Sequence, residues 1–324
     1  MAKKDAPRNA SRNLASILWD RAGMLLVFVV LFIACSLFVE DFLSLANMKG
    51  LALSVSMIGM VACTMLFCLA SGDFDLSVGS VVALSGVLAA VVANASGSVV
   101  LGMLSGILAG GAVGSFNGVV IAKFRINALI ATLATMQIVR GMAFIFSGGR
   151  AVSVTNPAFF KLGKSSFLGI PSPVWITILC LAVFGIIIRS TAFGRHTLAV
   201  GGNKEAARLA GIPVPLLKIT IFAMQGLMAG FAGIVLASRM TSGQPKPPEM
   251  FELQVISACV LGGVSLTGGV GTITCVIAGV LIMGTVENAQ NLLNVQTFYQ
   301  NVVRGMILLT AVMLDQLKNR ARRD

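Results

Sequence analysis

Residues 76–122 read LSVGSVVALSGVLAAVVANASGSVV followed by LGMLSGILAGGAVGSFNGVVIA, and no charged side chain interrupts them. One membrane-crossing helix needs roughly 20 apolar residues, so this stretch is long enough for two. The polar and small residues of 94–98 mark a break between the two helices. The stretch therefore predicts an all-α membrane protein with at least one pair of consecutive spans.

The same criterion, applied outward along the chain, predicts ten spans. The charge-free run 253–286 is also long enough for two helices, with a glycine break at 268–271. The expected spans are 22–39, 50–71, 76–94, 99–122, 127–147, 173–189, 217–238, 253–267, 272–288 and 301–315. We therefore expect one polytopic transmembrane domain over 22–315, between a basic segment at 1–21 and a basic tail at 316–324.

Composition and charge agree with a membrane protein. Of the 324 residues, 56% are hydrophobic and 11% are charged, whereas soluble domains carry about 25% charged residues. The net charge of +12 comes from basic residues that flank the apolar runs, as the positive-inside rule describes, so a nucleic-acid partner is not needed to explain it. The rule places both termini and the loop 190–217 in the cytoplasm, which is typical of a multi-pass protein of the bacterial inner membrane.

The sequence indicates no metal, cofactor or catalytic site of its own. The six cysteines lie in apolar runs without metal-ligand spacing, and His196 is the single histidine. The segment 158–165 ends in GKS like a phosphate-binding loop, but it lacks the first glycine and no strand precedes it. We therefore expect a transport subunit and not an enzyme.

The chain also repeats itself internally. The tetrapeptide Val-Arg-Gly-Met at 139–142 recurs at 303–306, and Asn127 has a counterpart at the same offset in Asn291. A looser echo links Gly114, Ser115 and Asn117 with Gly284, Thr285 and Asn288. Because the fifth and tenth spans run in opposite directions, the repeat is inverted, as in many transporter folds.

The segment 71–80 places two carboxylates, Asp73 and Asp75, beside a glycine between two spans. Charges near membrane depth usually face a cavity, a partner charge or the interface, so a substrate or coupling role is one interpretation. The other is structural, because Asp75 and Ser77 are suited to capping the next helix. Arg140 and Arg304, at matched positions of the repeat, either bind a polar substrate or pair with a carboxylate.

A ladder of glycines at every fourth position from Gly102 to Gly118 predicts close helix contact, either within one subunit or at a dimer face.

In the cytoplasmic loop, Asn203 is suited to cap a short helix that Gly211 and Pro213 end. Its apolar residues are mostly small alanines, which favours docking into a protein groove over burial in lipid.

Three segments resemble the permease subunits of bacterial ABC importers for monosaccharides of the ribose, galactose and arabinose type. Residues 71–80 are similar to the family's Gly-Gly-Ile-Asp-Leu-Ser-Val-Gly pattern, with Asp73 and Phe74 in place of its Gly and Ile. Residues 194–211 and 261–272 resemble its cytoplasmic signature and its glycine-rich segment. The resemblance covers nearly the whole chain, and 65–75, 132–141 and 238–245 look most like the members that carry L-arabinose.

The resemblance implies a homodimer of permeases, a separate cytoplasmic ATPase that binds ATP and Mg, and a periplasmic sugar-binding protein. It also implies that the short cytoplasmic helix receives the motion of the ATPase. The residues expected to couple to the ATPase are Gly201, Gly202, Asn203, Glu205, Ala206, Ala207, Arg208 and Gly211. The residues expected to line the substrate pathway or its hinges are Asp73, Asp75, Asn117, Gln137, Arg140, Asn288 and Arg304.

Two alternatives remain open from the sequence. The inverted repeat and the charges at membrane depth also suit an ion-coupled secondary transporter. The same importer class could instead carry another sugar, an autoinducer or a nucleoside.

Overall fold

The computed structural model describes residues 14–248 and 250–320. Most of the expected N-terminal segment 1–21 and the end of the expected tail, 321–324, lie outside the described residues. The long helices are α1 (Leu14–Phe38), α2 (Leu45–Ala70), α3 (Val78–Ser96), α4 (Val99–Lys123), α5 (Ala128–Ser147), α7 (Ser172–Ser190), α8 (Ala192–Gly202), α10 (Val214–Met240), α11 (Phe251–Leu261), α12 (Ile273–Leu292) and α13 (Thr297–Arg320). The short elements are η1 (Pro157–Phe160), α6 (Lys161–Lys164), α9 (Lys204–Leu209), and the strands β1 (Val152–Ser153), β2 (Ser166–Phe167), β3 (Ile170–Pro171) and β4 (Ser242–Gly243).

A helix lies at each of the ten expected spans, and within the described residues seven helices are long and apolar enough to cross a membrane: α2, α3, α4, α5, α7, α10 and α12. The eighth expected span, 253–267, is wrong in length, because α11 ends at Leu261 before Gly262 and Gly263. Gly263, Gly268 and Gly269 all have positive φ angles, which a helix does not allow. The tenth extends to Arg320, so part of the expected tail is helical.

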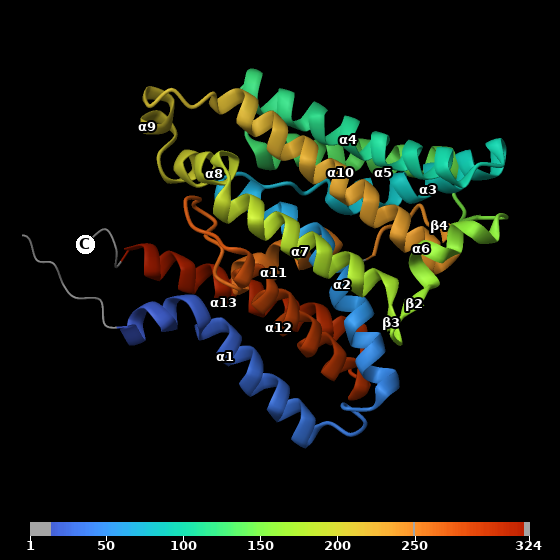
Figure 1. The fold of residues 1–324 in the computed structure, drawn as a ribbon, viewed down its shortest axis with the longest axis horizontal. Coiled ribbons are helices and arrows are strands. Elements are labelled where there is room, and N and C mark those ends of the chain that lie inside the picture. Colours follow the sequence, from blue (N-terminus) through green and yellow to red (C-terminus); the bar gives the residue numbers. More distant parts are fainter. Residues whose placement is uncertain (1–13, 249, 321–324) are drawn as a thin grey trace, which may run out of the picture.

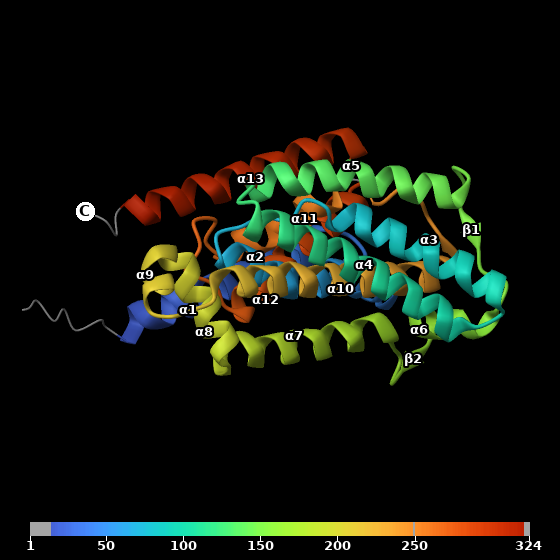
Figure 2. The same cartoon turned by 90° about the horizontal axis from the view of Figure 1, so that it is seen from above.

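The helices form an elongated bundle whose two ends differ. The segment α8–α9 lies at one end, together with the start of α10 and the end of α13, and the four short strands lie at the other end (Figure 1). Seen from above, α5 and α13 lie on one side of the bundle and α7 lies on the opposite side (Figure 2). In the pairs β1–β4 and β2–β3 the strands run antiparallel. The helices α8 and α9 and the four short strands therefore lie at opposite ends of the bundle.

The glycine ladder on α4 packs inside the chain. The ladder glycines are all buried: Gly102, Gly106, Gly110, Gly114 and Gly118. A Cβ atom at Gly102 or Gly106 would collide with backbone of α3, and one at Gly110, Gly114 or Gly118 would collide with backbone of α10. The ladder thus brings three helices into backbone contact, as small residues do in membrane bundles, and it is not left free as a dimer face.

The spatial arrangement of the helices follows the repeat. Helix α3 packs against both α4 and α5, and α11 packs likewise against α12 and α13. Helix α4 also packs on α10, while α12 packs on α2. Helices α5 and α13 run in opposite directions along the bundle (Figure 2). The first half, α2–α5, and the second half, α10–α13, are therefore related by an inverted arrangement.

Candidate functional site

The loop between α7 and α10 contains two helices where the sequence predicts one. Helix α8, which we did not predict, begins after Thr191, whose hydroxyl accepts the Gly194 backbone N–H at 3.2 Å. The Phe193 ring of α8 lies 5.6 Å from the Phe67 ring of α2, measured between centroids. The sequence signal for α8 was Thr191, which is suited to cap a helix, with Gly194 three residues later. The three glycines of α8 obscured the helical spacing of its apolar residues.

Helix α9 forms as the sequence predicts. The side chain of Asn203 accepts the Ala206 backbone N–H at 2.9 Å, which is an N-cap. At the other end Gly211 has a φ of +85°, its N–H donates to the Arg208 carbonyl, and the Ile212 N–H donates to the Ala207 carbonyl. This pair of hydrogen bonds is a Schellman motif, so the helix is closed at both ends by its own sequence.

The outer face of this segment is open to contact. Ala207 is 5% exposed and points inward, whereas Leu209 is 80% exposed and lies outside any apolar span. The exposed residues also include Gly202, Asn203, Glu205, Ala206, Arg208 and Gly211, so seven of the eight predicted coupling residues lie together on or beside α9 with Gly201 behind them. A cleft of about 220 Å³ opens between α8 and the start of α10.

Behind α9 the chain forms a glycine junction, by which we mean Ala70, Gly72, Gly201, Gly268 and Gly269. The Gly269 backbone N–H donates to the Ala70 carbonyl at 2.9 Å. A Cβ atom at Gly201 would collide with the Ala70 carbonyl oxygen and lie 2.5 Å from the Gly269 nitrogen. The end of α8 therefore rests directly on the end of α2 and on the loop between α11 and α12.

The connection from α2 to α3 carries an ion pair. Lys218, near the start of α10, lies with its Nζ 2.5 Å from the Asp73 carboxylate, and both side chains are only 10% exposed. Sequence reasoning missed Lys218, although it is the single charge in the first six turns of α10. The pair ties the helix that follows α9 to the break that precedes α3, and so links the coupling segment with the bundle interior.

Asp75 is buried and makes its hydrogen bonds locally. One of its oxygens accepts both the Ser77 backbone N–H at 2.9 Å and the Ser77 hydroxyl at 2.6 Å. The Asn117 amide of α4 donates to the Ser77 oxygen at 3.0 Å. Burial raises the pKa of the Asp75 carboxyl, and the bonds from Ser77 oppose that shift. Asp75 thus orders the turn before α3, while Ser77 makes no side-chain cap, contrary to one of our interpretations.

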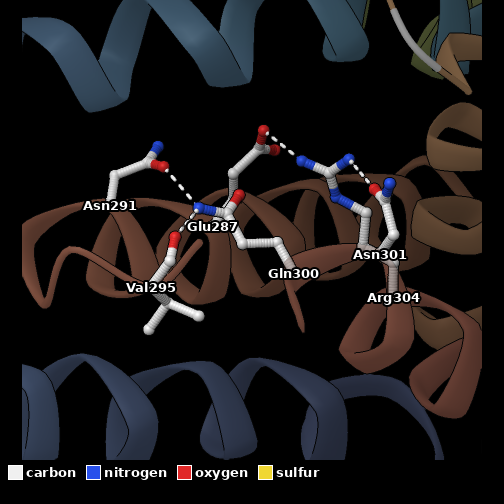
Figure 3. A network of polar contacts seen from close by, with 6 residues as sticks. All are labelled: Glu287, Asn291, Val295, Gln300, Asn301 and Arg304. Atoms are coloured by element: carbon white, nitrogen blue, oxygen red, sulfur yellow. Dashed lines mark hydrogen bonds and ion pairs between the residues drawn. The ribbon is translucent and has the colours of Figure 1, made fainter. Parts of the chain in front are cut away.

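A polar network holds α12 to α13 (Figure 3). The Arg304 guanidinium lies 2.7 Å from the Glu287 carboxylate and donates to the Asn301 side chain at 3.2 Å. Nearby, the Gln300 amide donates to the Asn291 side chain at 3.0 Å. Glu287 is the single charged residue of α12, which is the signal that could have predicted this partner. The sequence left two roles open for Arg304, to bind a polar substrate or to pair with a carboxylate, and in this structure Arg304 pairs with a carboxylate.

Asn288 and Gln137 lie apart from that network. The side-chain amides of Asn288 and Asn47 bond reciprocally at 2.7 and 2.9 Å, which links α12 to the start of α2. Gln137 is exposed on α5 and makes no side-chain hydrogen bond among the described residues. Asn47 carries no distinguishing sequence signal, since it is an ordinary polar residue at a helix start.

Arg140 differs from its repeat partner. Its side chain is half-buried, its Nε is enclosed without a hydrogen-bond partner, and no described carboxylate lies within 4.0 Å of it. The predicted pathway residues therefore separate into three groups. Asp73, Asp75 and Asn117 lie at the α2–α3 break, Asn288 and Arg304 bond along α12, and Gln137 and Arg140 remain on α5.

Comparison with known proteins gives consistent matches over nearly the whole chain. The profile of a family described as "Branched-chain amino acid transport system / permease component" matches residues 47–312. The chain is 60% identical over 306 residues to the L-arabinose transport system permease protein AraH of Escherichia coli (strain K12), covering 94% of this chain and 93% of that protein. It is 57% identical to the L-arabinose ABC transporter permease protein AraH of Azospirillum brasilense, covering 98% of this chain and 94% of that protein.

A more distant match is the ribose import permease protein RbsC of Bacillus subtilis (strain 168), at 40% identity over 93% of this chain and 94% of that protein. No solved structure matches the chain significantly. The similarity thus extends over nearly the full length of these permease subunits.

Proposed function

Because this chain belongs to the family of branched-chain amino acid transport system permease components, we propose that it is the membrane permease of an ATP-driven importer for L-arabinose. The family description mentions amino acids, but the relatives that match along the full length are sugar permeases. The L-arabinose permeases share markedly more of its residues than the ribose permease does. That full-length similarity is the observation that carries the proposal.

The chain is a transport subunit of the inner membrane and not an enzyme. ATP, with Mg, binds to a separate cytoplasmic ATPase, and a periplasmic binding protein delivers the sugar. We propose that two copies of the chain form the pathway, that each crosses the membrane ten times over 22–315, and that both termini are cytoplasmic. The basic residues at 1–21, 190–217 and 316–324 support this orientation.

The segment α8–α9 is the proposed contact with the ATPase. Its closed caps make α9 rigid, and its outward face carries an exposed leucine, Leu209, on a helix too short to span a membrane. Displacement of α9 would act on the glycine junction and, through Lys218 and Asp73, on the α2–α3 break. ATP binding would then shift the population toward the outward-open state, because it favours the arrangement that closes the ATPase.

The proposed pathway lies along the polar side chains of α5 and α13. These helices share one side of the bundle and run in opposite directions (Figure 2), so two copies meeting there would enclose polar residues from both halves. Gln137, Arg140 and Arg304 are then the pathway residues. Asp73, Asp75 and Asn117 are hinge residues, because their bonds lie at the break between α2 and α3. Asn288 is also a hinge residue, because its bonds with Asn47 join α12 to α2.

Reconstitution tests the function. Proteoliposomes would contain this chain, its ATPase and the binding protein, and uptake of L-arabinose would be compared with that of ribose, galactose and xylose. We expect ATP-dependent uptake that needs all three components and prefers L-arabinose. Uptake driven by a proton or sodium gradient without the ATPase would instead establish a secondary transporter, and preference for another solute would correct the cargo.

The coupling role has its own test. The double variant Asn203→Asp, Ala207→Glu puts two extra negative charges on α9, one of them at the inward-facing Ala207. We expect loss of ATPase recruitment and of uptake, while the permease still inserts into the membrane. Co-purification of the ATPase measures the first effect, and normal transport by this variant would refute the assignment.

A further inference from the structure

The two arginines of the repeat occupy matched sequence positions, but their surroundings differ. Arg304 is neutralised by Glu287 at 2.7 Å and is also bonded to Asn301. Arg140 has no described carboxylate within 4.0 Å, and its enclosed Nε has no hydrogen-bond partner. The inverted repeat thus keeps one guanidinium paired and leaves the other uncompensated.

From its position on α5, the Arg140 guanidinium does not easily reach the membrane surface. It lies seven residues before the end of α5 at Ser147, which corresponds to roughly 10 Å along the helix axis. Helical side chains lean toward the N-terminus, so the Arg140 side chain leans away from that end and toward the middle of the helix. Snorkelling to the nearer surface, the usual solution for a basic residue near a helix end, would oppose this direction.

An unpaired charge at such depth needs a polar environment. Charged residues inside membrane proteins face the bundle interior or a water-filled cavity, because hydrocarbon does not solvate them. Three acids of the bundle are already engaged: Asp73 with Lys218, Asp75 with Ser77, and Glu287 with Arg304. A fourth, Glu252, lies against Gly79 of α3 and more than 4.0 Å from Arg140. Arg140 is therefore available for a ligand.

We propose that Arg140, with Gln137 one turn before it, forms a binding subsite for sugar hydroxyls in the pathway, an inference that rests on the proposed function. A guanidinium carries five N–H donors in a fixed fork, which matches the paired oxygens of neighbouring hydroxyls. The Gln137 amide adds both a donor and an acceptor on the exposed face of the same helix. A neutral sugar does not cancel the charge of Arg140, so it is held by hydrogen bonds alone and can leave.

The experiment measures sugar molecules taken up per ATP hydrolysed, in proteoliposomes with the ATPase and the binding protein. The variants are Arg140→Gln, which removes the charge, and Arg140→Lys, which keeps the charge but loses the fork. The matched control is Arg150→Gln, an exposed arginine just beyond the same helix.

We expect the sugar-to-ATP ratio to fall about tenfold in Arg140→Gln and about threefold in Arg140→Lys, as for loss of direct hydrogen bonds to a ligand. Arg150→Gln is expected to match the wild type. The preference for L-arabinose over ribose is expected to weaken in both Arg140 variants, because the fork orients the hydroxyls. A merely structural role would lower ATPase activity and uptake together and leave that preference unchanged.

The outcomes separate this inference from the proposed function. If the wild type fails to take up L-arabinose, the proposed function falls. If the wild type transports L-arabinose and both Arg140 variants keep its ratio and preference, the subsite is overturned. It is also overturned if Arg140→Gln separates the two permease copies during gel filtration, because the guanidinium would then pair across the dimer.

Discussion

The two halves of the chain share one arrangement of helices, but different interactions hold them together. Five glycines along α4, in the first half, bring its backbone against α3 and against α10 of the second half. Its counterpart α12 contacts the backbone of α11 at Gly262 and Gly279, but polar side chains hold it to its other neighbours: Arg304 of α13 pairs with Glu287, and Asn288 bonds with Asn47 of α2. Backbone contact leaves little freedom to shift, whereas hydrogen bonds between side chains can exchange for water or ligand.

This difference shows how an inverted repeat can serve two purposes. The helices α3, α4 and α10 form a closely packed block, whereas α12 packs closely on α11 alone and joins α13 and α2 through polar contacts. An alternating-access mechanism needs one part to move against another. The contrast predicts that changes at the glycine contacts damage folding, while changes at the polar contacts of α12 act more mildly.

The largest effect is expected from Gly114→Leu. Its side chain would collide with the Phe222 carbonyl oxygen and with Gly226, whose Cα lies 2.9 Å from the position of a Cβ, and both residues belong to α10. Overpacking costs about 1–3 kcal/mol even where side chains can yield, and here backbone must move. We expect no monodisperse protein by gel filtration. The control is Gly50→Leu, which should fold, because no atom lies within 4 Å of a Cβ at that position. If both variants behaved alike in gel filtration, the glycine contacts of α4 would not be what holds its neighbours.

The next effect concerns the buried ion pair between the start of α10 and the α2–α3 break. Lys218→Met leaves the Asp73 carboxylate buried without its cation, which costs about 3–5 kcal/mol in comparable pairs. We expect a clear loss of thermal stability in detergent. The double variant Asp73→Asn, Lys218→Met should recover most of it, and additive losses would show that the two side chains do not interact.

A smaller effect is expected from the network of the second half. Arg304→Gln removes a charge-assisted bond between side chains that are 14% and 29% exposed, so water can replace part of it. We expect a loss of about 1–2 kcal/mol in unfolding free energy, measured by thermal denaturation. A loss as large as that for Lys218→Met would mean that the polar contacts between α12 and α13 hold as firmly as the buried ion pair at the α2–α3 break.

The smallest effect is expected on the surface of α9. Glu205 pairs with Arg208 at 3.0 Å, but these side chains are 70% and 65% exposed. Exposed pairs contribute about 0.2–1 kcal/mol, so Glu205→Gln should barely move the melting temperature. A marked loss of stability without the ATPase would indicate that α9 helps to fold the bundle and is not simply a docking element.

Much of this architecture could be predicted from local sequence. Each of the ten expected spans corresponds to a helix, because apolar length needs no tertiary information. The cap at Asn203 and the stop at Gly211 also follow from neighbouring residues. Helix α8 escaped prediction because its glycines mask the period, and the length of α11 was overestimated because hydropathy does not register the turn at Gly262 and Gly263.

The candidate sites could be predicted only in part. The residues of α9 are contiguous, so one segment of sequence contained nearly all of that surface. The pathway and hinge residues came without their partners, since Lys218 is far along the chain from Asp73 and Asn47 is far from Asn288. Nothing in the repeated tetrapeptide indicates that Arg304 is paired and Arg140 is not.

The sequence by itself determined the membrane class, the positions of the helices, the inverted repeat and the capped helix α9, because each depends on residues close together in the chain. Only the tertiary structure decided that the glycine ladder packs inside one subunit, that Gly201 rests on Ala70 and Gly269, and which carboxylate neutralises which cation. These outcomes depend on distances between segments, and hydrogen bonds and ion pairs act only over a few ångströms.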